Sequence, residues 1–249
     1  MKRAWYLGVT AEDVAARCIL VGDPGRIELF AERLDGVRQI SQERGLRTVT
    51  GTHAGTPVTV SAFGMGAPIA AVVLEELAGV GARVVLRAGT AMAVGGDADL
   101  LGSLVLAGAA MRGEATSATY APLGYPAVAD PVLLGAAREA MQRSGARYRE
   151  GIMASYDGFY TELFAADEAR KEGVKVRFAE LARLGVLAAD METSAVLVVG
   201  SVLGLRAGSL CLVSVDGRFG TRLDEAARRV GEDVLVETAL SAVTATPAE

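Results

Sequence analysis

Arginines, carboxylates and glycines recur in this sequence directly after short hydrophobic runs. Examples are the GDPGR string at residues 22–26, Arg87 after a VVL run, and Asp216 after the run Ser209–Val215. Turn amides and forked guanidinium groups are the donors that suit a phosphate dianion. A carboxylate in such a place can accept hydrogen bonds from hydroxyl groups or move a proton. If the runs are strands of one sheet, their carboxyl ends bring these glycines, arginines and carboxylates to one edge, where ligands of such sheets bind.

His53 is the only histidine of the chain, which limits the chemistry further. A single histidine nearly excludes both a histidine-based catalytic triad and a metal site with several histidine ligands. Acid–base work falls to Asp, Glu, Lys or Tyr.

Composition favours a soluble enzyme-sized domain. The 249 residues carry a net charge of -5, which argues against a protein that wraps nucleic acid. Cys18 and Cys211 lie far apart in apolar runs and are expected to be buried free thiols of a reducing compartment. No N-terminal signal is visible, and the uncharged run Thr193–Leu205 is too short for a span of about 20 residues. We expect a cytoplasmic protein without membrane or nucleic-acid partners.

The elements that must position these residues alternate between strand and helix. Predicted strands are Arg17–Gly22, Thr48–Thr52, Pro57–Phe63, Val84–Ala88, Ser103–Ala107, Gly151–Ser155, Val186–Ala189 and Ser209–Val215. Predicted helices are Arg26–Leu34, Pro68–Leu77, Pro131–Ser144, Glu168–Leu184 with an interruption at Gly173, Glu192 to about Leu203, and Leu223–Val243. This alternation predicts one α/β domain over residues 1–249, with helices on both faces of a mostly parallel sheet.

In this order the polar strings resemble the hexameric nucleoside phosphorylase family, which includes purine nucleoside and uridine phosphorylases. The strings are GDPGR (22–26), ERG (43–45), GMG (64–66), RAGT (87–90), YPAVAD (125–130), DGFY (157–160), DMETSA (190–195) and VDG (215–217), and they cover nearly the whole chain. The resemblance implies a single domain with a central mixed sheet and a homo-oligomer, a hexamer built as a trimer of dimers. It also implies cleavage of a nucleoside by inorganic phosphate as co-substrate, with no metal and no organic cofactor.

The family's phosphate ligands match five positions of this sequence. The resemblance implies contacts from Gly22, Arg26, Arg87 and Thr90, and from Arg44 of a neighbouring subunit. Any one of these arginines could instead be a solvated surface charge. Arg87 is expected at an inner strand end, however, where a buried arginine needs an anion.

The family's ribose site falls on the string Asp190-Met191-Glu192 and on Met65. The resemblance implies that Glu192 binds the 2′- and 3′-hydroxyls and that the methionines pack against the sugar. Both methionines could instead be ordinary core residues. Tyr6 stands where the family commonly has a histidine that reaches a neighbour's 5′-hydroxyl. Asp190, expected on the base side, is one methylene shorter than the family's glutamate and could equally be a helix N-cap.

The family's base site implies a purine substrate and a catalytic acid. Asp216 matches the aspartate that protonates a purine at N7, and Phe159 matches the aromatic residue that stacks on base or sugar. Asp216 could also be a turn residue before Gly217. Uridine-specific members have Gln and Arg where this chain has Leu163 and Ala165, which favours a purine. Met92 replaces a usual glycine and is expected to narrow the base pocket.

Alternative functions stay open at this point. A uridine phosphorylase belongs to the same family, and a nucleosidase would use water in place of phosphate. A non-catalytic nucleoside-binding protein is the alternative of another class, suggested by Met92, Asp190 and Tyr6. A dinucleotide-binding dehydrogenase does not fit, because GDPGR is not a G-x-G-x-x-G fingerprint.

Overall fold

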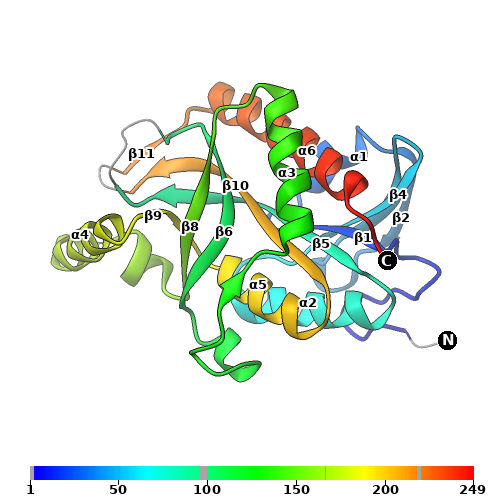
Figure 1. Ribbon diagram of the computed structural model, residues 1–249, viewed down its shortest axis with the longest axis horizontal. Helices are drawn as coiled ribbons and strands as arrows, with labels where there is room; N and C mark the ends of the chain where they lie inside the picture. Colours follow the sequence, from blue (N-terminus) through cyan, green and yellow to red (C-terminus); the bar gives the residue numbers. More distant parts are fainter. Residues whose placement is uncertain (1–2, 96–99, 166, 218–219) are drawn as a thin grey trace.

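A mixed β-sheet runs through the centre of the computed structural model, which describes residues 3–95, 100–165, 167–217 and 220–249 (Figure 1). Its strands are β1 (Arg17–Val21), β2 (Asp35–Ser41), β3 (Thr48–His53), β4 (Thr56–Ala62), β5 (Val84–Ala93), β6 (Leu104–Gly113), β7 (Ala127–Val128), β8 (Tyr148–Tyr156), β9 (Val186–Asp190), β10 (Arg206–Asp216) and β11 (Thr221–Arg222). The strand order is β11-β10-β6-β8-β9-β5-β1-β4-β3-β2, with β7 beside β6 and a further pairing between β10 and β5.

The extra pairing of β10 with β5 closes part of the sheet into a ring. Strands β5, β9, β8, β6 and β10 follow one another around it, with parallel and antiparallel pairs mixed. β1 and β4 extend the sheet from β5 in parallel register, and β3 and β2 continue it antiparallel. The carboxyl ends of β1, β4, β5 and β10 therefore meet at one edge.

Helices cover both faces of this sheet (Figure 1). They are α1 (Arg26–Ala31), α2 (Ala67–Gly79), α3 (Pro131–Ser144), α4 (Glu168–Arg183), α5 (Thr193–Val202) and α6 (Glu225–Ala245). α1, α3 and α6 lie on one face, α2 and α5 on the other, while α4 projects from one end of the molecule. Short helical turns occur at Glu43–Gly45, Thr116–Thr119 and, as a π-helix, Phe159–Leu163.

β1 shows why its sequence forms a central strand. Ile19 and Val21 pack in the core under α1 and α6, whereas Cys18 and Leu20 pack in the core under α2. Because neighbouring side chains of a strand point to opposite faces, a strand with layers on both sides must be apolar throughout. The predicted α/β class, with a central mixed sheet between helices, is confirmed.

The structure also corrects the predicted elements at two places. The interruption of the helix at Gly173 is wrong: α4 continues through it, because Val174, Phe178 and Leu181 bury one side of the helix. Such packing offsets the helix cost of a glycine, about 1 kcal/mol. Strand β2 was not predicted, because its residues are mostly exposed and polar and show no apolar alternation.

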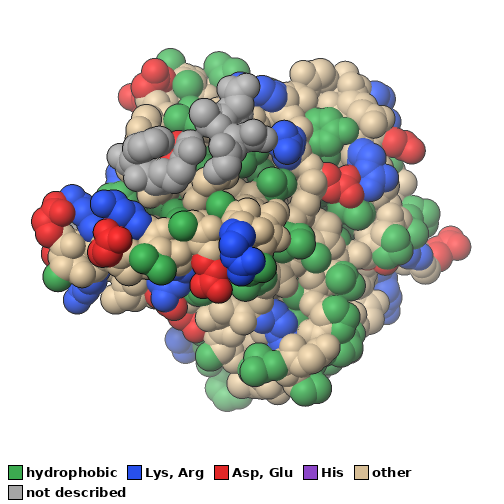
Figure 2. Space-filling view, turned by 60° about the vertical axis from the view of Figure 1, so that its left-hand side comes forward, with side chains coloured by type: hydrophobic (Ala, Val, Ile, Leu, Met, Phe, Trp, Pro, Cys, Tyr) green, Lys and Arg blue, Asp and Glu red, His purple; other side chains and the backbone are tan. Residues whose placement is uncertain are grey.

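The outer surface is highly charged in places. Figure 2 shows acidic and basic side chains intermixed over the end of the molecule from which α4 projects. No helix among the described residues is long and apolar enough to cross a membrane.

Candidate active site

A cavity of about 170 Å³ opens at the edge where the strand ends meet. Its walls come from the segments that follow β1 and β4, from the second half of β5, from the end of β9 and from β10. The lining residues are Gly22, Arg26, Gly64, Met65, Arg87, Gly89, Thr90, Ala91, Met92, Phe159, Leu163, Ala189, Asp190, Met191, Glu192, Ser214 and Val215. Nine predicted site residues are thus brought together: Gly22, Arg26, Met65, Arg87, Thr90, Phe159, Asp190, Met191 and Glu192.

The turns after β1 and β4 approach each other closely at the cavity. A Cβ atom on Gly22 would lie 3.0 Å from the carbonyl oxygen of Gly64. Gly66 has φ of 97°, a left-handed conformation that favours glycine, and its amide donates to Glu192 Oε1 over 2.7 Å. The GMG string therefore anchors one oxygen of the glutamate that is expected to bind ribose.

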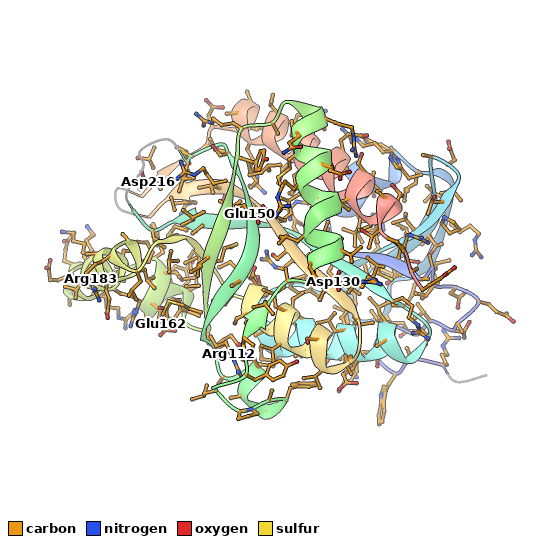
Figure 3. The ribbon with its side chains drawn as sticks, viewed as in Figure 1. Arg112, Asp130, Glu150, Glu162, Arg183 and Asp216 are labelled. Carbon is orange, nitrogen blue, oxygen red and sulfur yellow. The ribbon has the colours of Figure 1, made fainter. Side chains whose placement is uncertain are left out.

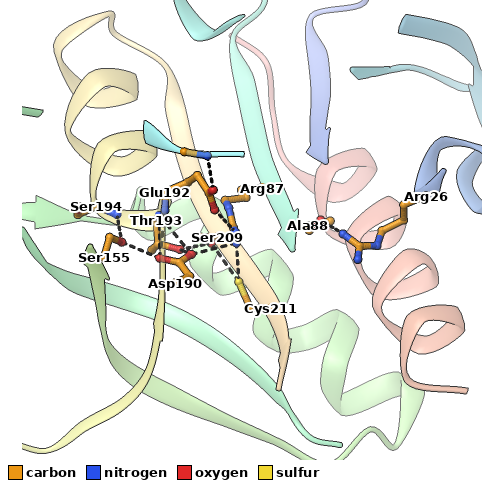
Figure 4. A network of polar contacts seen from close by, with 11 residues as sticks. Arg26, Arg87, Ala88, Ser155, Asp190, Glu192, Thr193, Ser194, Ser209 and Cys211 are labelled. Atoms are coloured by element: carbon orange, nitrogen blue, oxygen red, sulfur yellow. Dashed lines mark hydrogen bonds and ion pairs between the residues drawn. The ribbon is translucent and has the colours of Figure 1, made fainter. Parts of the chain in front are cut away.

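Arg87 is buried at the end of the apolar half of β5, and its guanidinium faces two carboxylates (Figure 4). Its Nη2 lies 2.5 Å from Glu192 Oε2, and its Nη1 lies 3.1 Å from Asp190 Oδ2. Nη1 also donates to the Cys211 sulfur over 2.7 Å. A Cβ on Gly89 would lie 2.2 Å from Nη1, so only glycine leaves room for this arginine.

These two carboxylates satisfy the buried charge of Arg87, which was expected from the sequence to need a bound anion. A buried arginine does need an anion, and in the structure Glu192 and Asp190 supply it. Burial alone therefore no longer points to phosphate at Arg87. The Nε of Arg87 is buried without a hydrogen-bond partner among the described residues.

The Asp190 carboxylate, which was predicted to contact the base, makes several hydrogen bonds within the protein. Its carboxylate accepts from Ser155 Oγ over 2.6 Å and from Thr193 Oγ1 over 2.5 Å. It also accepts from the Thr193 amide, 3.1 Å away, at the start of α5. The N-cap position of α5 is Glu192, so the alternative interpretation of Asp190 as the N-cap is wrong in its position, although the Asp190 carboxylate does accept from the first amide of α5. Asp190 also lines the cavity.

Burial also shifts pKa values within this cluster. It raises the pKa of Glu192, against the opposing effect of the Arg87 guanidinium. Burial likewise raises the pKa of the Cys211 thiol. Both shifts follow from the loss of water around the charged forms.

Arg26 lies at the other end of the cavity, at the start of α1 (Figure 4). Its Nη1 donates to the Ala88 carbonyl over 3.3 Å, and its Nη2 pairs with Glu232 over 3.0 Å. Its Nε is buried and finds no hydrogen-bond partner in the described part of the chain. Buried donors are nearly always satisfied, so an unpaired one beside a cavity is a place for a ligand.

Tyr6, Arg44 and Asp216 are not among the residues that line the cavity. Arg44 lies over the Tyr6 ring, with 4.9 Å between the guanidinium carbon and the ring centroid. The amides of Tyr6 and Leu7 each donate to the Glu76 carboxylate over 2.7 Å. Asp216 is the last residue of β10 and is 8% exposed (Figure 3).

Apolar side chains line a further part of the cavity wall. Phe159 stands edge-on to Tyr160, with ring centroids 5.0 Å apart, and Leu163 is buried beside it. Sequence reasoning missed Ser214, a lining residue, and Cys211, which contacts Arg87. The predicted strand Ser209–Val215 already contained both, but the register shift between Val213 and Val215 interrupts the simple alternation that would have assigned them to a face.

Among the described residues, no group of three or more His, Cys, Asp or Glu side chains is placed to hold a metal ion.

Comparison with known proteins gives the class. The family model of the phosphorylase superfamily matches residues 16–243. Uridine phosphorylase of Thermococcus kodakarensis is 34% identical over 244 residues, 96% of this chain and 85% of the relative. Guanosine phosphorylase of Halorubrum lacusprofundi is 33% identical over 219 residues, 88% of this chain and 85% of the relative. Uridine phosphorylase of Vibrio fischeri, solved with 6-hydroxy-1-naphthoic acid, has a TM-score of 0.89 at 30% identity, covering 98% of this chain and 97% of its own.

The chain therefore belongs to the phosphorylase superfamily. The resemblance stated from the GDPGR, RAGT and DMETSA strings is confirmed.

Proposed function

We propose that this protein cleaves the N-glycosidic bond of ribonucleosides with inorganic phosphate, giving the free base and ribose 1-phosphate. The observation that carries the proposal is the pair of cavity arginines, Arg26 and Arg87, each with a buried Nε that lacks a partner among the described residues. The Nη atoms of both arginines are hydrogen-bonded to protein groups, whereas the two Nε donors, with the Gly22 turn and the Thr90 hydroxyl, suit a phosphate dianion. The named relatives are nucleoside phosphorylases, which supports the same reaction.

The proposed reaction proceeds through an oxocarbenium-like ribosyl transition state. Phosphate held by Arg26 and Arg87 lies on one side of C1′, stabilises the positive charge and forms the new bond to carbon. Glu192 accepts hydrogen bonds from the ribose hydroxyls, while Met65 and Met191 pack against the sugar. The bond from C1′ to the base breaks, and its electron pair leaves with the base. No covalent intermediate with the protein is needed.

Uridine is the first candidate substrate. Two of the three named relatives are uridine phosphorylases, so the purine preference predicted from sequence is not supported and the uridine alternative fits better. A purine nucleoside stays the second candidate, because Leu163 lines the cavity where uridine-specific members are expected to carry glutamine. The guanosine phosphorylase of Halorubrum lacusprofundi keeps that candidate open.

Further parts of the proposal concern assembly and surroundings. We propose a homo-oligomer, a hexamer built as a trimer of dimers, in which Tyr6 and Arg44 complete a neighbour's site; their place outside the cavity of their own chain is compatible with this. The co-substrate is inorganic phosphate, and no metal, organic cofactor, nucleic acid or membrane takes part. A cytoplasmic location is proposed from the free, buried Cys18 and Cys211.

Two experiments test these proposals. Uridine, guanosine, inosine and adenosine are incubated with the enzyme and phosphate, and the released base is quantified; a rate for guanosine above that for uridine would reverse the order of candidates.

For the assembly, inactive Arg44→Met and Arg87→Met proteins are mixed after dissociation. Regained activity supports sites shared between subunits, whereas a fully active monomer would contradict them.

A further inference from the structure

A second cavity adjoins the first along the part of its wall that includes Phe159. It measures about 280 Å³, and the two cavities share Thr90, Met92, Phe159, Ser214 and Val215 as lining residues. The first cavity, at about 170 Å³, is smaller than the range of about 300–1,000 Å³ usual for ligand sites. The first cavity therefore leaves little room for a two-ring base beside ribose and phosphate.

Met92 lines both spaces, and its side chain packs in the buried cluster that includes Leu163 and Phe178. It lies on β5 opposite Ala189 of β9 on one side and Val215 of β10 on the other, so its backbone is fixed by both neighbours. Its side chain is 4% exposed and reaches Gly217, where a Cβ would lie 2.8 Å from the Met92 Cγ. A methionine is unbranched and adapts its shape more readily than other apolar residues.

The second cavity differs from the first in its charge. Arg222 and Arg228 line it, together with Phe164. The Arg222 guanidinium carbon lies 5.4 Å from the centroid of the Phe164 ring, which places a cation above an aromatic face at the cavity wall. These donors suit a carbonyl oxygen on the outer edge of a base.

We propose that Met92 is the specificity-determining residue of this site, because its side chain separates the first cavity from the space that the outer edge of a two-ring base would need. The inference rests on the proposed function. With Met92 in its present position, the site admits a one-ring pyrimidine and excludes most of a two-ring purine. Removal of the side chain joins the two cavities and brings a purine carbonyl within reach of the Arg222 side of the second cavity.

The test compares substrates, because a ratio is insensitive to general loss of activity. The ratio of kcat/KM for guanosine to that for uridine is measured with phosphate in the wild type, Met92→Ala and Met92→Leu. We expect the ratio to rise at least about 10-fold in Met92→Ala, the worth of about 1.4 kcal/mol. Met92→Leu, which keeps the volume, is expected to keep the wild-type ratio. Met111→Ala is the matched control, since Met111 lines neither cavity.

An unchanged ratio in an active, cooperatively unfolding Met92→Ala protein would overturn the role of Met92. If that variant does not fold, competition in the wild type decides instead: uracil is expected to inhibit at least about 10-fold better than guanine, and equal inhibition would overturn the inference. A wild type that cleaves no nucleoside would contradict the proposed function itself, which is a distinguishable outcome.

Discussion

The guanidinium of Arg87 and the carboxylate of Glu192, 105 residues apart in the chain, lie 2.5 Å from each other inside the cavity. In the proposed reaction, one of these residues binds phosphate and the other binds ribose. The same two groups therefore neutralise each other in the protein alone and face the two reactants when these are bound. The stability of the fold and the chemistry of the site depend on the same charges.

Loss of Arg87 is expected to destabilise the protein strongly. Arg87→Met leaves Asp190 and Glu192 buried beside an apolar side chain, and breaking a buried pair in this way costs about 3–5 kcal/mol. The measurement is the free energy of unfolding in urea. Arg138→Met is the control, because Arg138 pairs with Glu150 at the surface and its loss is expected to cost no more than about 1 kcal/mol. Equal costs would contradict the description of Arg87 as a buried, paired charge.

The raised pKa of Glu192 predicts a specific dependence of stability on pH. Above the ordinary value of 4.5 and up to its raised pKa, the folded protein holds a proton that the unfolded chain has lost. Stability from this group is therefore present below pH 4.5 and is lost as pH rises through the folded pKa. Glu192→Gln is expected to remove this decline.

Glu150 supplies the control with the opposite sign. The hydrogen bond from Arg138 lowers the pKa of Glu150, so its contribution is present above pH 4.5 and is lost as pH falls. Urea unfolding between about pH 4 and pH 8 compares each glutamine variant with the wild type. A Glu192→Gln protein with the wild-type slope would show that Glu192 does not titrate in this window.

Arg26 is expected to act on phosphate more than on the nucleoside. Arg26→Lys keeps the charge but loses the forked geometry. A lost hydrogen bond to a charged group is worth about 1.5–3 kcal/mol, so KM for phosphate should rise about 10-fold or more while KM for the nucleoside changes little. Arg33→Lys is the matched control: Arg33 also pairs with α6, through Asp233, but does not line the cavity. Equal effects of the two variants would remove Arg26 from the phosphate site.

Asp216 is predicted to act as the acid for purine substrates. Asp216→Asn keeps the shape of the side chain but cannot deliver a proton, and general acid catalysis is worth about 100- to 10,000-fold. A loss of that order in kcat/KM is expected for inosine, with a smaller loss for uridine, which has no N7. Inosine cleavage at the wild-type rate by a folded variant would make Asp216 only a turn residue.

The sequence predicts the strands that carry the site better than it predicts the contacts within it. Apolar runs such as Val84–Ala88 identify central strands, because both faces of those strands are buried. The partners of Arg87 could not be predicted, because they come from three elements that are distant from β5 in sequence: Asp190 from β9, Glu192 from the start of α5 and Cys211 from β10. Met92 was expected to narrow the pocket, but its place in the walls of two cavities depends on the ring formed by β5, β9 and β10.

The decisive measurement is whether release of the base from a nucleoside requires phosphate. The enzyme is freed of phosphate by dialysis and incubated with uridine and, separately, with guanosine, with and without added phosphate. Free base and ribose 1-phosphate are quantified together. We expect base release only when phosphate is present, with one ribose 1-phosphate formed for each base. Equal base release without phosphate, with free ribose as the product, would contradict this expectation in favour of a nucleosidase, and no release with either substrate would leave a nucleoside-binding protein.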